Sequence, residues 1–374
     1  MANTSDIANE KTNFSASNGL CKRLHELNAS VAISSYQSNL IYLVGRNRQG
    51  GINIHQTTIQ RPMGMSAAVG ENISTNNKRL TLSTGCGVVQ FQNTLEQGQE
   101  INEAFDTCYV PRVIYMTGNL DAHDVGVSSE NTAIFVNTRF NCLATPSEKH
   151  SFEMIWKPYF ISELVDEDRC HLNGMAIRGG KPKYVTAISQ SDTIDGWRDR
   201  RANGGVIIDV ESDEIVCTGL SMPHSPRWHN GQLWVLNSGT GELGTVPLEG
   251  PDKGKFQPIS FCPGFLRGLS FHGNLAIVGL SRPRYKRFEG LALDARLKEA
   301  DSDPWCGIQF IDLTTGACVD WLRFDGATDE LYDVEFLTDV TCPMAVAPTS
   351  GDIASLITFD GMKAAAPKRE AVTP

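Results

Sequence analysis

The sequence predicts an all-β protein, a six-bladed β-propeller, and three observations carry that prediction. Short apolar runs broken by Gly, Asn, Asp and Pro recur along the chain, whereas long amphipathic stretches are scarce. A short phrase recurs six times, at intervals of 41 to 66 residues. Most copies are followed by a turn and then by an apolar run. Repetition of a multi-strand unit at such a period is typical of radial β-architectures. A pair of β-sandwiches or an irregular all-β fold is the alternative.

Each apolar run is expected to form one strand of a blade. The runs are NLIYLVG (39–45), RLTLSTG (79–85), TAIFVNT (132–138), GGVIIDV (204–210), QLWVLNS (232–238), NLAIVGL (274–280) and GIQFIDL (307–313). Residues 39–45 and 52–59 precede the first phrase, and we expect them to close the ring against the C-terminal end. One helix is expected over 291–303, in an insertion between strands.

The sequence predicts a single propeller domain over residues 19–360. Residues 1–18 are rich in Asn, Ser and Thr and are expected to be a disordered N-terminal segment. Residues 361–374 are expected to be a flexible C-terminal tail.

The recurring phrase is expected to open the innermost strand of each blade. Its copies begin at Arg61 (RPMG), His123 (HDVG), His171 (HLNG), His224 (HSPR), Phe265 (FLRG) and Leu331 (LYDV). Because the inner strands of a propeller run parallel, the first residues of the copies should ring one mouth of the central channel. Side chains alternate along a strand, so first and third positions should face the channel and second positions, such as Asp124 and Tyr332, should lie between blades. Glycine at the fourth position of four copies would let the backbones converge.

Three consecutive copies begin with histidine, which predicts a metal site. If the copies are in register, His123, His171 and His224 converge on the channel axis. Three imidazoles suit a divalent Zn, Fe or Mn ion and leave coordination positions open for water or substrate. The alternative is that these imidazoles only hydrogen-bond neighbouring blades.

Other polar side chains are expected around the same mouth. Asp333 and Glu335 are two residues apart, and one of them could act as a general base. Arg267 is expected to complete the catalytic set by orienting an anionic group. The residues expected to bind substrate are Asn173, Arg227 and Arg61. The structural alternative for Arg267 and Arg227 is a buried arginine–aspartate ion pair, with Asp333 as the expected partner. Two polar insertions, 190–201 and 281–290, could serve as lids or be plain solvated loops.

Composition limits the classes of protein that the chain can belong to. It has 374 residues, 41% hydrophobic and 20% charged, with a net charge of −10. This acidity disfavours nonspecific nucleic-acid binding. No apolar run is long enough to cross a membrane, and the first twenty residues contain no apolar signal region. We therefore expect a cytoplasmic protein without a membrane partner. The ten cysteines include no CxxC pair and are expected to be free and mostly buried.

Several blocks resemble those of a family of bacterial proteins known only as a domain of unknown function. The blocks are HDVG (123–126), CHLNGMA (170–176), MPHSPRWHNGQLWVLNSGTGELG (222–244), PGFLRGLSF (263–271) and LYDVEFL (331–337). The resemblance covers about residues 30 to 350 and implies a six-bladed propeller. It implies no activity, so the chemistry is argued from the residues.

These observations favour an enzyme over a binding module. We expect it to act on a small polar or anionic molecule at the channel mouth with a histidine-ligated divalent metal, in lyase, hydrolase, isomerase or oxygenase chemistry. The alternative is a non-catalytic scaffold that binds a peptide or protein on its face. The unusual residues fall at the predicted mouth, which favours the enzyme.

Overall fold

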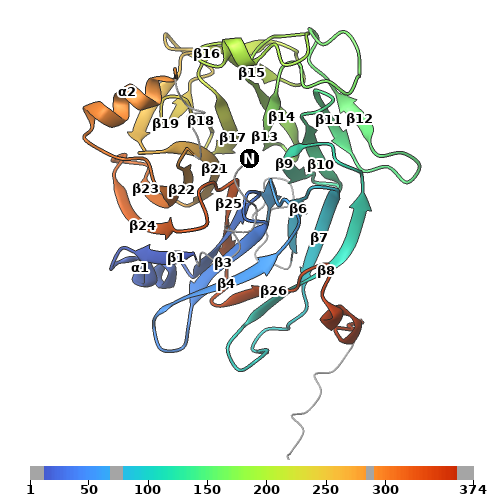
Figure 1. The fold of residues 1–374 in the computed structure, drawn as a ribbon, viewed down its shortest axis with the longest axis vertical. Coiled ribbons are helices and arrows are strands. Elements are labelled where there is room, and N and C mark those ends of the chain that lie inside the picture. The colour runs from blue at the N-terminus through green and yellow to red at the C-terminus, as the bar shows by residue number, and fades with distance from the viewer. Residues whose placement is uncertain (1–11, 68–78, 284–289, 360–374) are drawn as a thin grey trace, which may run out of the picture.

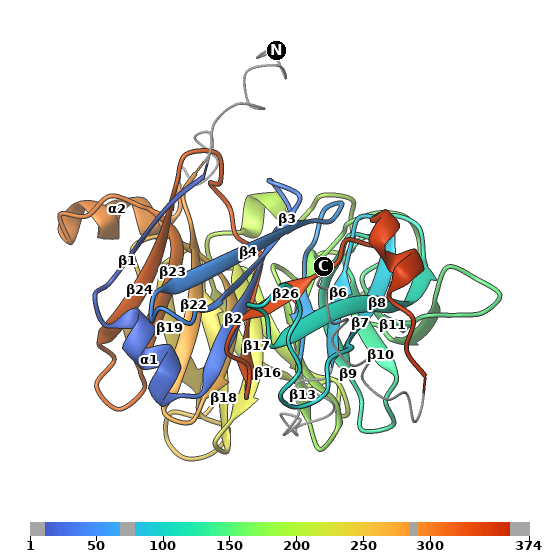
Figure 2. The same ribbon diagram turned by 90° about the horizontal axis from the view of Figure 1, so that it is seen from below.

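The computed structural model describes residues 12–67, 79–283 and 290–359. Its strands form six sheets that radiate from a central axis (Figure 1), and Figure 2 shows the same ring from the side. The predicted six-bladed propeller is therefore confirmed. Among the described residues, no helix is long and apolar enough to cross a membrane.

Each blade contains four strands that pair in antiparallel order from the axis outward. Blades one and two are formed by β25 (Asp333–Thr338), β2 (Ala29–Ser35), β3 (Leu40–Arg46) and β4 (Ile52–Thr58), and by β5 (Met65–Ser66), β6 (Arg79–Ser83), β7 (Gly87–Asn93) and β8 (Thr107–Met116). Blades three and four are formed by β9 (Ala122–Val127), β10 (Ala133–Asn137), β11 (Cys142–Thr145) and β12 (Glu153–Trp156), and by β13 (Leu172–Arg178), β14 (Lys181–Ala187), β15 (Gly205–Asp209) and β16 (Ile215–Leu220). Blades five and six are formed by β17 (Pro223–His229), β18 (Gln232–Asn237), β19 (Glu242–Val246) and β20 (Gln257–Phe261), and by β21 (Phe265–His272), β22 (Leu275–Ser281), β23 (Cys306–Asp312) and β24 (Cys318–Asp325).

The two ends of the chain close the ring. The C-terminal strand β25 pairs with β2, so blade one combines both ends of the domain, as the runs before the first phrase predict. Two further strands extend outer edges: β1 (Asn13–Ala16) pairs with β24, and β26 (Pro343–Ala345) pairs with β8 in parallel. Residues 13–16 are thus ordered, and the prediction of disorder over 1–18 is wrong for them. Residues 1–11 and the predicted tail over 361–374 lie outside the described residues.

Helices are few and lie at the periphery. Helix α1 (Leu20–Glu26) packs beside the ring closure, and α2 (Ala292–Glu299) falls within the predicted stretch 291–303. Within the described residues, short 3-10 helices span Arg198–Arg200 and Gly351–Ser355. In the predicted lid at 281–290, residues 284–289 lie outside the described residues.

The hydrophobic core lies between neighbouring blades. The second strand of a blade is covered on both faces, and every residue of β10 and β22 is buried. Two-sided burial explains why these strands read as continuous apolar runs instead of alternating ones. The ten cysteines are free thiols, and most are buried.

A belt of side-chain hydrogen bonds links each blade to the next, and we call it the inter-blade belt. In five blades, a hydroxyl near the end of the second strand donates to a carbonyl at the start of the next inner strand. These contacts are Ser34 to Met63 (2.6 Å), Ser83 to Ala122 (2.8 Å), Thr138 to Leu172 (2.6 Å), Ser238 to Leu266 (2.7 Å) and Ser281 to Leu331 (3.2 Å). In blade four, the Asn173 amide donates to the Pro223 carbonyl instead (3.0 Å).

The inner strands approach one another closely at the phrase glycines. A Cβ on Gly64 would lie 2.6 Å from the Asp124 Cα, and one on Gly268 would lie 2.6 Å from the Val334 nitrogen. Gly268 also has a φ of 81°, which side chains other than glycine rarely adopt. The predicted convergence of backbones at the fourth phrase position is confirmed at these two glycines.

Candidate functional site in the central channel

The six inner strands enclose a channel in which polar side chains gather at successive levels. We call the cluster at the strand starts the histidine mouth: His123, His171, His224, Arg267, Tyr332 and Trp197. Three residues beyond His224 along β17, Arg227 lies between Asp124 and Asp333, and we call these three the arginine layer. Beyond it lies a cavity bordered by Glu335, the Glu335 cavity.

Two histidines of the mouth occupy equivalent positions. The His123 Nδ1 lies 2.7 Å from the Asp121 carbonyl oxygen, and the His224 Nδ1 lies 2.8 Å from the Met222 carbonyl oxygen. In both cases the partner is two residues earlier and has a positive φ, 52° for Asp121 and 48° for Met222. This bend therefore precedes the inner strand in blades three and five.

His171 does not share that position, and the predicted alignment is wrong for blade four. His171 itself has a φ of 52° and precedes the paired residue Leu172, so it takes the place of the bend residue. Asn173 occupies the position of the other imidazoles, and its amide serves the inter-blade belt. A phrase match cannot show which of its residues forms the bend, because several polar residues tolerate positive φ in short bends.

His171 still reaches the other residues of the mouth. Its ring centroid lies 4.8 Å from that of His123 and 4.2 Å from that of Trp197. The His171 Nδ1 lies 2.6 Å from Asp168 Oδ2, and the Trp197 indole N–H donates to the same oxygen at 3.0 Å. The insertion 190–201 thus buries one aromatic residue against the mouth.

The Nδ1 partners determine the tautomer of the three imidazoles. Carbonyl and carboxylate oxygens only accept, so Nδ1 carries the proton and Nε2 carries a lone pair in each neutral ring. The described part of the chain offers no hydrogen-bond partner to any of these Nε2 atoms. Burial lowers the pKa of His123 to about 4 and the pKa of His224 well below its usual value. Both rings are therefore neutral at pH 7.

This tautomer suits metal ligation, but the placement of the rings does not assemble a three-ligand set. Over residues 12–67, 79–283 and 290–359, no three His, Cys, Asp or Glu side chains are arranged to hold one ion. The His224 ring packs on Phe265, with centroids 5.3 Å apart. The divalent metal stays a prediction.

Arg267 lies at the mouth, where its guanidinium is 3.4 Å from Glu330 and donates to the Tyr36 hydroxyl at 3.1 Å. The alternative of a buried pair with Asp333 is therefore not found for Arg267, whereas Arg227 lies 3.6 Å from that aspartate. The Arg267 guanidinium also lies 5.6 Å from the ring of Tyr332, which in turn contacts His123. Tyr332 therefore faces the mouth, not the space between blades.

Arg61 stands at the rim of the mouth. It is 38% exposed and forms a 2.5 Å ion pair with Asp121. This pair attaches the start of blade two to the bend of blade three.

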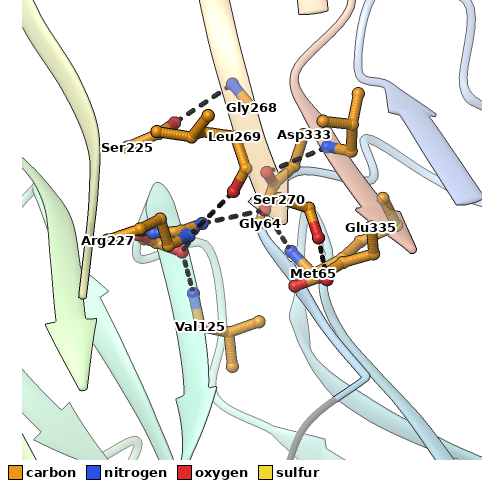
Figure 3. Close-up of polar contacts among 12 residues, drawn as sticks. Gly64, Met65, Val125, Ser225, Arg227, Gly268, Leu269, Ser270, Asp333 and Glu335 are labelled. Atoms are coloured by element: carbon orange, nitrogen blue, oxygen red, sulfur yellow. Dashed lines mark hydrogen bonds and ion pairs between the residues drawn. The ribbon is translucent and has the colours of Figure 1, made fainter. Parts of the chain in front are cut away.

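The arginine layer crosses the channel. Arg227 binds Asp124 at 2.7 Å, lies 3.6 Å from Asp333, and donates to the carbonyls of Leu269 and Met175 at 3.1 and 3.0 Å. These partners belong to blades three, one, six and four, so one side chain of blade five connects most of the ring. Figure 3 shows Arg227 facing Asp333 across this level.

Each carboxylate of the layer also accepts a hydrogen bond from a backbone N–H of the next inner strand. Asp124 accepts from the Met175 N–H at 2.9 Å, and Asp333 accepts from the Met65 N–H at 2.8 Å. Asp124 was expected between blades, and that prediction is wrong. The pairing of β9 with β10 shifts register at this level, which breaks the strict alternation of side chains.

The Glu335 cavity has a volume of about 440 Å³ and is lined by all six inner strands. Its wall mixes apolar side chains, such as Met65, Met175 and Phe271, with polar ones, such as Arg227 and Asn230. Glu335 Oε2 accepts from the Ser270 hydroxyl at 2.9 Å (Figure 3). Burial raises the pKa of Glu335 to about 8 and that of Asp333 to about 7. Asp333 and Glu335 share the channel side, as predicted, but they contact the arginine layer and Ser270 instead of surrounding the imidazoles.

Several residues of the channel escaped the sequence analysis. Asp168 lies three residues before His171, a spacing that could have suggested an imidazole–carboxylate pair. Glu330 directly precedes the phrase that begins at Leu331, and no motif in the sequence marks it as a channel residue. Ser270 follows the phrase of blade six, and its link to Glu335 joins residues 65 positions apart. Such long-range pairs leave no local trace in one sequence.

Comparisons with known proteins give a family and distant structural neighbours. Residues 18–346 match the family model described as "Domain of unknown function (DUF4915)". A search of curated proteins finds no match.

Three similar solved structures span most of the chain at low identity. A chain of a nidogen–laminin complex is 10% identical with a TM-score of 0.49, and covers 84% of this chain and 100% of its own length. Virginiamycin B lyase from Staphylococcus aureus is 9% identical (TM-score 0.40, 84% and 99% covered), and a functionally unknown protein from Desulfotomaculum acetoxidans is 8% identical (TM-score 0.42, 84% and 99% covered). The similarity to a propeller enzyme is distant, at 9% identity.

Proposed function

Because the chain belongs to the DUF4915 family, a domain of unknown function, we propose its function from the channel alone: an enzyme that performs acid–base chemistry on a small polar molecule in the Glu335 cavity. The observation that carries the proposal is a carboxyl group that lines a cavity and is held protonated near neutral pH. An acid with a perturbed pKa that lines a cavity is a candidate for the reacting group of an active site.

In this proposal Glu335 exchanges a proton with the substrate. A pKa near 8 suits a proton donor at neutral pH, because the acid is both protonated and close to the working pH. Asp333 contributes negative charge that helps to keep Glu335 protonated. Elimination, hydrolysis and isomerisation all use such a proton transfer.

Arg227 has a structural part in this chemistry. Each of its nitrogens already has a protein partner, so the guanidinium holds Asp124 and Asp333 in place and is not free to clamp a substrate. The catalytic role expected of Arg267 and the binding roles expected of Arg61 and Asn173 concern the opposite end of the channel. The proposal gives these three residues no part in the proton transfer.

A divalent metal at the histidine mouth is a separate proposal, supported by the free Nε2 atoms of His123, His171 and His224. Zn²⁺, Fe²⁺ and Mn²⁺ titrations of protein purified without a histidine tag test it. Stoichiometric binding that is lost in His171→Ala would place a metal centre at the mouth. Protein that binds none of these ions would leave the imidazoles as hydrogen-bonding groups of the blades.

The enzyme proposal is tested by incubating the protein with mixtures of small polar metabolites and following their depletion by NMR. We expect the wild type to consume at least one compound, and Glu335→Gln to slow that reaction by about 10² or more. The rate should also fall as the pH rises through about 8, because a donor loses its proton there. Glu242→Gln, a half-buried glutamate on β19 that pairs with Arg296, is the matched control and should react like the wild type. Equal rates in wild type and Glu335→Gln, or no depletion by either, would refute the proposal.

A further inference from the structure

The charges around the Glu335 cavity are unequal. Three carboxyl groups, Asp124, Asp333 and Glu335, stand against one guanidinium, Arg227. Arg227 is committed to the two aspartates, so Glu335 is left without a cationic partner. The cavity can therefore accommodate one more positive charge, and it opposes a negative one.

The other side chains that line the cavity add no charge to these three carboxyl groups and one guanidinium. His229 lines it from β17, but burial lowers its pKa and its ring is neutral. Its Nε2 lies 2.8 Å from the Gly273 carbonyl oxygen. From β21 the cavity receives the Ser270 hydroxyl, which donates to Glu335 Oε2. The lining residues of β5 and β13 carry no ionisable group.

One oxygen of Glu335 is available to a ligand. Oε2 accepts from Ser270, whereas Oε1 has no hydrogen-bond partner among the described residues. The apolar part of the cavity wall, which can hold the body of such a ligand, is contributed by Met65, Met175, Ile177, Phe271 and Phe336. A volume of about 440 Å³ is sufficient for a small organic molecule.

We infer that the ligand of this cavity is a small amine, with its ammonium group on Glu335 and a short apolar body against the methionine and phenylalanine side chains. An ammonium brings three donors and one charge, which match the free carboxyl oxygen and the charge imbalance. The inference goes beyond the proposed function, because it names a ligand whose ammonium ionises Glu335 and so occupies the acid that the proposed proton transfer uses. Its binding can be measured without turnover.

Binding of an amine should release a proton. At pH 7 Glu335 is largely protonated, since its pKa is about 8. An adjacent ammonium favours the ionised form, so the carboxyl O–H breaks and its proton passes to the buffer while the ligand keeps its own charge. The product is an ammonium–carboxylate pair in the cavity.

The experiment is calorimetric titration with n-hexylamine at pH 7 in phosphate and in HEPES, two buffers that contain no primary amine. The dependence of the heat on the buffer gives the number of protons released. We expect close to one proton in the wild type and none in Glu335→Gln, with affinity at least about tenfold weaker in that variant. Hexanol, which has the same apolar body without charge, should bind both proteins alike, and hexanoate should bind the wild type more weakly than hexylamine.

The outcomes separate this inference from the proposed function. Glu242→Gln and the wild type should bind hexylamine equally. Hexylamine binding that Glu335→Gln leaves unchanged, or tighter binding of hexanoate, would overturn the amine class. Amine binding without depletion of any compound would refute the enzyme and leave the binding site. Depletion of a neutral compound by a protein that does not bind hexylamine would refute the amine class and support the proposed enzyme.

Discussion

The histidine mouth and the Glu335 cavity are two ends of one channel, built by the same six inner strands, and they differ in how their charges are matched. At the mouth, the imidazoles of His123 and His224 are neutral, and the one guanidinium, Arg267, has one carboxyl partner. At the cavity, Arg227 pairs with two carboxyls, Asp124 and Asp333, and Glu335 has no cationic partner among the described residues. Aromatic rings pack against one another at the mouth, whereas the other end holds an open volume.

This difference shows how a repeated scaffold acquires distinct sites. The strands repeat, so each end of the channel receives six equivalent positions. A distinct site arises where a single blade departs from the repeat. Arg227 is such a departure, because it stands where four other phrases have glycine. One long side chain in one blade then divides the channel into two environments.

The largest expected effect comes from comparing the two arginines, which are equally exposed at 18%. Arg227→Met leaves two buried aspartates and two carbonyls without their partner, and should lower the free energy of unfolding by about 3–5 kcal/mol. Arg267→Met leaves the Tyr36 hydroxyl and Glu330, and burial already raises the pKa of Glu330 to about 7, so that carboxyl can take up a proton. Its cost should be about 1–2 kcal/mol.

Urea denaturation of both variants measures this difference. Arg323→Met, which removes an arginine that is 47% exposed and pairs with Asp325, is the control and should cost under about 1 kcal/mol. Equal decreases in the free energy of unfolding for Arg227→Met and Arg267→Met would show that the contacts of the arginine layer stabilise the fold no more than those of the histidine mouth.

The second comparison is the pH dependence of stability, which should have opposite signs at the two ends. The pKa of Glu335 rises from 4.5 to about 8 on folding, so its folded state binds the proton more tightly. Stability from this group is present below pH 4.5 and is lost as the pH rises towards 8. The pKa of His123 falls from 6.5 to about 4, so its contribution is present above pH 6.5 and is lost as the pH falls towards 4.

Two substitutions isolate these contributions. The stability of Glu335→Gln relative to wild type should increase by about 1–3 kcal/mol from pH 5 to pH 8. For His123→Gln the relative stability should increase in the other direction, from pH 7 to pH 4.5, by a similar amount. Denaturation series at each pH provide the values. Slopes of the same sign for both variants would contradict the assignment of neutral imidazoles at one end and a neutral acid at the other.

The sequence was informative about the fold because the fold repeats. Six phrases and the apolar runs after them give the number of blades, and the runs at 39–45 and 52–59 indicate how the ring closes. The pairing of β25 with β2 joins residues some 300 positions apart, yet it follows from circular closure once the count is known.

The site was less predictable, because it depends on offsets of one or two residues. His171 and Asn173 exchange roles relative to the neighbouring blades, and Asp124 turns into the channel where β9 shifts register. Arg227 and Asp124 are 103 residues apart, so no local sequence pattern predicts their ion pair. Residue type identified the channel residues, while bends and register shifts decided which end each one serves.

The smallest expected effect concerns blade four, the blade that departs from the repeat at the mouth. Here the Asn173 amide, not a hydroxyl, reaches the next blade, and the buried Ser189 hydroxyl after β14 has no partner among the described residues. Asn173→Ala removes the only belt contact to Pro223 and should cost about 1–2 kcal/mol, as should Thr138→Val in blade three. Ser189→Ala removes a buried polar group that makes no bond, so it should be neutral or stabilising by up to about 1 kcal/mol. Urea denaturation of the three variants shows whether the Asn173 amide or the Ser189 hydroxyl links blade four to blade five. If Ser189→Ala lowers the free energy of unfolding as much as Asn173→Ala does, blade four uses a hydroxyl like the other blades, and Asn173 is free to face the mouth beside the imidazoles.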